Sequence, residues 1–216
     1  LLSSLFIFFM LDQLFSGYKK RYILNRLFMA GFWVAIAGLF YVHAVYFFLL
    51  IWIGLFILRS FSLREWFVPL LGFAFPLLFL FAFYYVSDTL TVHKLIDTIK
   101  QSYLNEVTVT YYDISYYAFY GLLALLVVFG SFSLLGRLPM LKIYVRKYYE
   151  ILWWMFAGSV ASFILINQVS VELLYFVALP LSFLLADYIH SVRSRVFGNM
   201  VLFLLIAGLA FIQYMN

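Results

Sequence analysis

Three residues of one apolar stretch, Pro69, Gly72 and Pro76, have a spacing that could open a helix for substrate binding. Proline removes a backbone donor and clashes with the preceding turn, so a helix over Trp66–Val86 is expected to bend or open there. Broken helices of this kind build substrate sites in membrane transporters. Glycine and proline are also common in ordinary membrane helices, so these residues are a candidate helix kink with either role.

Other side chains that could do chemistry are scarce or scattered. The chain has no cysteine, which excludes disulfides, thiolate metal sites and cysteine nucleophiles. Its three histidines, His43, His93 and His190, lie far apart in the sequence. Phosphate-binding loops, dinucleotide glycine patterns and hydrolase or metalloprotease motifs do not occur. We therefore predict no metal and no cofactor, and the sequence identifies no catalytic residue.

The one long polar segment, residues 88–112, has a pattern typical of a surface helix. Apolar residues recur at helical spacing along it and polar residues occupy the other face. A stripe this narrow is expected to rest on lipid headgroups or on protein. We predict an amphipathic helix that contacts a partner through Val92, Lys94, Leu95, Ile96, Ile99, Lys100 and Tyr103.

The composition indicates what surrounds these segments. Hydrophobic residues make up 67% of the chain, aromatic residues 23% and charged residues 11%. Soluble domains carry about 25% charged and about half apolar residues, so lipid must solvate most of this surface. The net charge of +5 is concentrated in short loops between apolar runs, where it sets membrane topology. We therefore expect the lipid bilayer as a partner and no nucleic acid.

The apolar runs predict an all-α fold, a polytopic transmembrane helix bundle of about eight spans. The run over 23–58 is too long for one span, so we expect it to turn at Tyr41-Val42-His43. Residues 1–216 are expected to form a single integral membrane domain, a fragment that lacks N-terminal helices. The predicted spans are 1–15, two within 23–58, 66–86, 114–135, 151–166, 171–187 and 196–214.

The basic residues predict the orientation of these spans. Lys94 and Lys100 lie in the 88–112 segment, and the other twelve of the fourteen lie in alternate loops. Cytoplasmic loops of membrane proteins carry the Lys/Arg excess. We therefore expect the basic loops to face the cytoplasm and residues 88–112, with their amphipathic helix, to form an extracytoplasmic loop.

Small residues recur four apart on three apolar faces. Such pairs let membrane helices approach one another closely, within one chain or between subunits. The pairs are Gly31 with Ala35, Ala157 with Ala161, and Gly158 with Ser162.

The run Arg59-Ser60-Phe61-Ser62-Leu63-Arg64-Glu65-Trp66, followed by Pro69, Leu71-Gly72 and Pro76, resembles a known family. It is similar to polytopic inner-membrane proteins of Bacteroidota, a family of unknown function. The resemblance centres on Arg59–Pro76. It implies a multi-pass protein of the bacterial inner membrane and implies no activity.

Two classes of function fit these features, and a third stays open. The first is a non-catalytic subunit of a larger envelope complex for secretion, insertion or envelope assembly, with other membrane subunits as partners. The alternative is an integral membrane enzyme on lipid-linked or glycan substrates. Such enzymes hold phosphates with outward arginines, and none is predicted here. The third is a transporter, although no ionisable residue is predicted at the membrane midplane.

Overall fold

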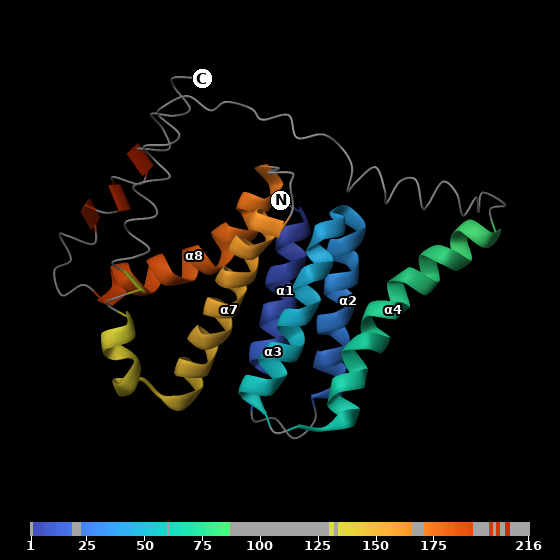
Figure 1. Cartoon of the computed structure of the whole chain (residues 1–216), viewed down its shortest axis with the longest axis horizontal. Coiled ribbons are helices and arrows are strands. Elements are labelled where there is room, and N and C mark those ends of the chain that lie inside the picture. Colours follow the sequence, from blue (N-terminus) through green and yellow to red (C-terminus); the bar gives the residue numbers. More distant parts are fainter. Residues whose placement is uncertain are drawn as a thin grey trace. The chain divides into compact units, whose positions relative to one another are not determined.

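The computed structural model describes residues 2–18, 23–59, 61–86, 130–131, 134–165, 171–191, 199–200, 202–203 and 206–207. Every regular element within these ranges is a helix (Figure 1), which confirms the all-α class for the described part of the chain. Contacts divide the chain into two compact units. The first is Leu1–Val107 with Ile143–Val177, and the second is Thr108–Lys142 with Ala178–Asn216. A single integral membrane domain over 1–216 stays a prediction.

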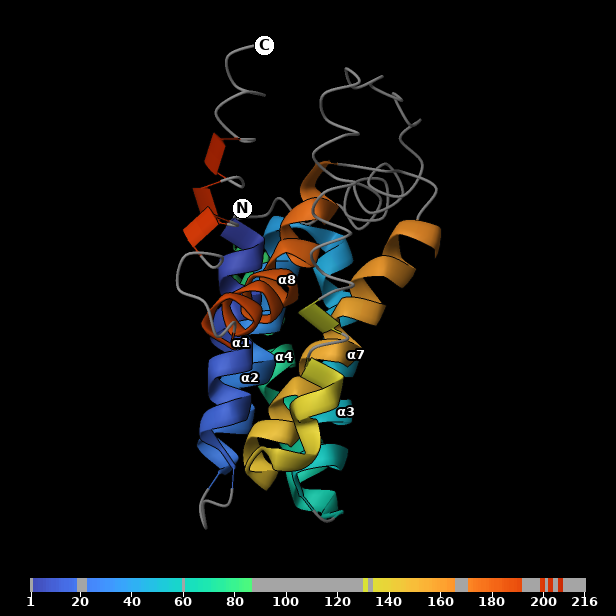
Figure 2. The ribbon, with the colours of Figure 1, turned by 90° about the vertical axis from the view of Figure 1, so that its left-hand side faces the viewer.

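The first unit is an antiparallel helix bundle. The chain turns at Tyr41, whose backbone is extended (φ −151°, ψ 108°) directly after α2, so the turn expected at Tyr41-Val42-His43 is confirmed. The tight η1 then leads into α3, and α7 packs beside α3 (Figures 1 and 2). The elements are α1 Leu2–Ser16, α2 Leu24–Phe40, η1 Val42–Phe47, α3 Phe48–Leu58, α4 Leu63–Val86 and α7 Ile143–Leu165.

The core of this unit lies where α1, α2, α3 and α7 meet. Its side chains are aliphatic or thioether groups, each fully enclosed by the bundle. They are Ile7, Met10, Val34, Ile51, Ile151 and Met155. Burial of one such side chain contributes about 1.5–3 kcal/mol relative to exposure in water.

Helix α4 joins the bundle along one narrow face. Its buried residues are Pro69, Gly72 and Pro76, and it packs mainly against α2. Only 11% of its most apolar 18-residue stretch is buried. Large side chains such as Leu78 and Phe79 are 64% and 73% exposed. An apolar surface of this extent is typical of a helix that contacts lipid or another protein.

Within the described residues, α4 is the one helix that is both long and apolar enough to cross a membrane. The other apolar helices are shorter: α1, α2, the pair η1 and α3, and residues 175–190 of α8. Eight spans are therefore not shown by the described part of the chain. The expected interfacial helix, residues 88–112, lies outside the described residues, as do most of the spans expected over 114–135 and 196–214.

The helices of the first unit alternate in direction. The end of α1, the start of α2, the end of α3 and the starts of α4 and α7 lie at the same end of this unit (Figure 1). Arg26, Arg59, Arg64, Arg146 and Lys147 flank these points in the sequence. We call this end of the first unit the basic end.

The second unit contains the short η2, Leu138–Met140, and the later part of α8, Val171–Ser191. Arg137 precedes η2 and donates from Nη2 to the Asp187 carboxylate of α8 at 2.9 Å. Pro180 lies inside α8 and is fully buried. The basic side chains nearest to Asp187 in the sequence are His190 and the arginines after it, whereas in this unit the carboxylate is paired with Arg137.

Candidate functional site

The three residues of the candidate helix kink lie where α4 crosses α2. A Cβ atom added at Gly72 would overlap the carbonyl oxygen of Phe28. One added at Gly31 would overlap the carbonyl oxygen of Pro69. The two backbones are therefore in direct contact, which only glycine permits at these positions. Gly31 and Ala35 are one of the pairs of small residues whose spacing predicted a close helix contact. The helix that contacts Gly31 is α4.

α4 continues through both prolines as one helix, and its ribbon changes direction along its length (Figure 1). Pro76 also lines a shallow apolar hollow of about 480 Å³ between α2 and α4, together with Phe32 and Phe79. A role of this bend in a substrate site or a partner contact stays a prediction.

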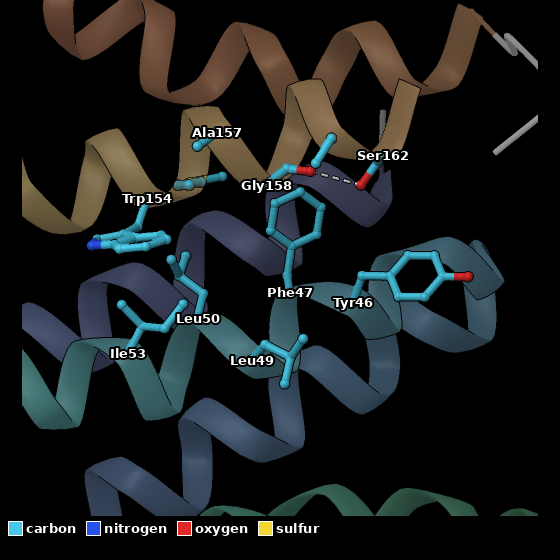
Figure 3. A pocket seen from close by; sticks show the side chains of 11 residues that line it. Tyr46, Phe47, Leu49, Leu50, Ile53, Trp154, Ala157, Gly158 and Ser162 are labelled. Atoms are coloured by element: carbon cyan, nitrogen blue, oxygen red, sulfur yellow. Dashed lines mark hydrogen bonds between the residues drawn. The ribbon is translucent and has the colours of Figure 1, made fainter. Parts of the chain in front are cut away.

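A second, deeper groove runs between α3 and α7 (Figure 3). Its volume of about 580 Å³ falls within the range of about 300–1,000 Å³ typical of binding pockets. One wall comes from η1 and α3: Tyr46, Phe47, Leu49, Leu50 and Ile53. The other comes from α7: Trp154, Met155, Ala157, Gly158, Ala161 and Ser162. Trp154 and Leu49 are about half exposed, so the groove is open along one side.

The α7 wall of this groove contains two of the three pairs of small residues expected from the sequence, Ala157 with Ala161 and Gly158 with Ser162. A Cβ atom added at Gly158 would meet nothing within 4 Å. At Gly31 the neighbouring helix fills that space. The face of α7 that carries Gly158 therefore has the residues of a close helix contact without a helix against it, among the described residues.

The serine hydroxyl on the groove wall is hydrogen-bonded within α7. The Ser162 hydroxyl donates to the Gly158 carbonyl oxygen at 2.8 Å, one turn back on the same helix (Figure 3). On the neighbouring face of α7, Ser159 is buried and donates to the Met155 carbonyl oxygen, also at 2.8 Å. The groove thus presents an apolar surface, suited to an aliphatic chain or a helix.

The described residues offer little for acid–base or metal chemistry. No three histidine, aspartate or glutamate side chains gather there at a spacing that suits a metal ion. The carboxylate of Glu65 pairs with Arg59 at 3.4 Å, next to the basic end. The walls of the α3–α7 groove contain no acidic, basic or histidine side chain.

An aromatic cluster lies at the basic end and was not among the features predicted from the sequence. Tyr148 of α7 stacks on Phe15 of α1 with ring centroids 4.5 Å apart, and its hydroxyl donates to the Phe15 carbonyl oxygen at 3.0 Å. Tyr18 and Tyr144 complete the cluster. Burial raises the pKa of the Tyr148 phenol, with smaller contributions from Tyr18 and Tyr144, so the hydroxyl stays protonated and remains a donor.

The residues predicted to contact a partner, Val92 to Tyr103, lie outside the described residues. One wall of the α3–α7 groove followed from small-residue spacing on α7. The opposite wall carries no periodic signal, because α3 is apolar along its whole length. The cluster around Tyr148 also had a partial signal, since tyrosines crowd the basic loop.

Comparison with known proteins gives one match. No curated protein and no solved structure matches the chain. A family model described as a family of unknown function (DUF6427) matches residues 1–216. This agrees with the resemblance noted around Arg59–Pro76 in so far as both indicate a family of unknown function. The chain belongs to the family of unknown function DUF6427.

Proposed function

We propose that this chain is a non-catalytic, multi-pass subunit of a larger assembly in the bacterial inner membrane. Its groove between α3 and α7 receives a transmembrane helix of a partner subunit. The observation that carries the proposal is the open space over Gly158, on a helix face built from Ala157, Ala161 and Ser162. Small residues at this spacing serve close helix contacts inside membranes.

The membrane setting has its own support. Helix α4 is long and apolar and has most of its surface exposed. The basic residues Arg26, Arg64 and Arg146 flank one end of the first unit, which fits a cytoplasmic face. The resemblance of Arg59–Pro76 to Bacteroidota proteins favours a bacterial inner membrane. We propose the eight-span topology and the interfacial helix over residues 88–112 as parts of this setting.

The alternative of an enzyme on lipid-linked substrates finds less support. Such an enzyme needs charged groups beside its apolar groove to hold a phosphate and move protons. The groove walls contain none. A coupled transporter would need ionisable groups inside the bundle. Among the described residues the buried polar side chains are four serines and one ionisable group, His43, which lies in η1 at the turn after α2.

Site-specific crosslinking tests the proposal. A photoreactive benzoylphenylalanine at Ala161, inside the groove, is expected to give a discrete adduct with another membrane protein in living cells. The same group at Phe56, which is 77% exposed on α3 and does not line the groove, serves as the control and is expected to give no discrete adduct. Adducts from Ala161 only to lipid, or only within the same chain, would contradict the proposed partner helix.

A further inference from the structure

At the basic end a lysine side chain lies over an aromatic ring. The Lys147 ammonium lies 5.9 Å from the centroid of the Tyr18 ring. A cation at this distance from an aromatic face is attracted by the ring quadrupole. The cluster described above fixes Tyr18, because its ring lies 6.0 Å from Tyr148 and 6.3 Å from Tyr144. Lys147 is half-buried, and its neighbour Arg146 is exposed.

These two cations have no carboxylate partner among the described residues. Glu150 follows Arg146 by one helical turn, is exposed and forms no ion pair with it. On α1, Asp12 is also exposed, and its carboxylate accepts from the Gln13 side-chain amide at 3.2 Å. The charge of Arg146 and Lys147 is therefore not neutralised by these neighbours, and it is available to an external anion.

Helix polarity adds to this positive potential. Arg146 and Lys147 lie in the first turns of α7, which contain no acidic residue before Glu150. The N-terminus of a helix carries a partial positive charge, so cations are unfavourable there and anions are favourable. A bound anion would relieve this repulsion. In the sequence, three further basic residues follow Tyr18 directly: Lys19, Lys20 and Arg21.

We propose that Tyr18, Tyr144, Arg146 and Lys147 form a binding site for the headgroup of an anionic phospholipid, which we call the headgroup site. The inference rests on the membrane setting of the proposed function. The Arg146 guanidinium and the Lys147 ammonium hold the phosphate oxygens of the lipid. The two tyrosine rings lie at headgroup depth, and the acyl chains follow the outer surface of the bundle.

Three observations favour a lipid over other anions. The site lies at the end of an apolar bundle, where a phosphodiester with two acyl chains satisfies both the cations and the adjoining apolar surface. Tyrosine is the residue type that membrane proteins place at this depth. An arginine that precedes this lysine in the sequence suits a phosphate, since its planar fork can donate two parallel hydrogen bonds.

Lipid retention by the purified full chain tests the headgroup site. The chain is exchanged into dodecylmaltoside micelles containing phosphatidylglycerol or phosphatidylcholine, and bound lipid is counted by native mass spectrometry. The wild-type chain is expected to retain phosphatidylglycerol in preference to phosphatidylcholine. In the variant Lys147→Gln this preference is expected to fall about fivefold, since one basic residue near an anionic headgroup contributes about 1 kcal/mol of binding.

Arg64→Gln is the matched control, because it removes the same charge from an exposed position at the same end. It is expected to retain the wild-type preference. Equal losses in the two variants would overturn the site in favour of diffuse attraction. Binding of inorganic phosphate at comparable strength would overturn the assignment to a lipid. Purification of the chain from cells without detergent would instead refute the membrane setting, so the two failures are distinct.

Discussion

Alanine in place of Gly31 or Gly72 is expected to destabilise the first unit more than any other single added methyl group. At either position the new Cβ atom would overlap a carbonyl oxygen of the facing helix, and a backbone cannot rotate away as a side chain does. Overpacking costs about 1–3 kcal/mol where side chains can adjust. We expect at least the upper part of that range, or a lowering of Tm by about 6–12 °C for a chain of this size.

The control is Gly136→Ala, where an added Cβ would meet nothing within 4 Å. Gly136 is helical, so alanine there is expected to be neutral or to stabilise by about 0.5–1 kcal/mol. Thermal unfolding of the detergent-solubilised variants measures both effects. A Gly72→Ala protein as stable as the Gly136→Ala protein would show that α2 and α4 do not cross in direct backbone contact.

The second large effect is expected from Gly158→Leu, which fills the groove between α3 and α7. The free chain should fold as well as before, because this position is open and leucine favours a helix more than glycine does. A partner helix, however, would be displaced. A cost of about 1–3 kcal/mol at the contact corresponds to roughly a 5- to 150-fold loss of affinity for the partner.

Affinity purification in mild detergent, with quantitative mass spectrometry of the recovered membrane proteins, measures this loss. Gly136→Leu introduces the same side chain at a position that is also open and does not line the groove. It is expected to recover the partner at the wild-type level. Undiminished recovery with Gly158→Leu would mean that the groove is not the contact surface.

Much of the local structure was predictable, because helix ends and turns depend on neighbouring residues. The turn at Tyr41 followed from the length of the apolar run and its most polar point. The small faces of α2 and α7 followed from spacing. The helix that each of these faces contacts could not be predicted, since a small residue indicates a close approach but does not identify the neighbouring helix. Gly31 and Gly72 were singled out for unrelated reasons, and only the structure shows that they lie on the same contact.

The features that sequence reasoning missed depend on contacts between distant segments. Tyr148 looks like one more interfacial tyrosine until Phe15, 133 residues earlier, accepts its hydrogen bond. Asp187 had nearer basic neighbours in the sequence than Arg137, which pairs with it across 50 residues. Uniformly apolar segments such as α3 also carry no periodicity that would tell a groove wall from a lipid-facing surface.

The most direct test is whether the basic end of the first unit faces the cytoplasm of an inner membrane. The chain has no cysteine, so single cysteines report without interference. In intact cells, Ser62→Cys in the α3–α4 connection should resist an impermeant thiol reagent and react after permeabilisation. Thr91→Cys, in the predicted outward segment, should react in intact cells. Labelling of Ser62→Cys with protection of Thr91→Cys would reverse the orientation, and recovery of both variants in the soluble fraction would contradict the membrane setting itself.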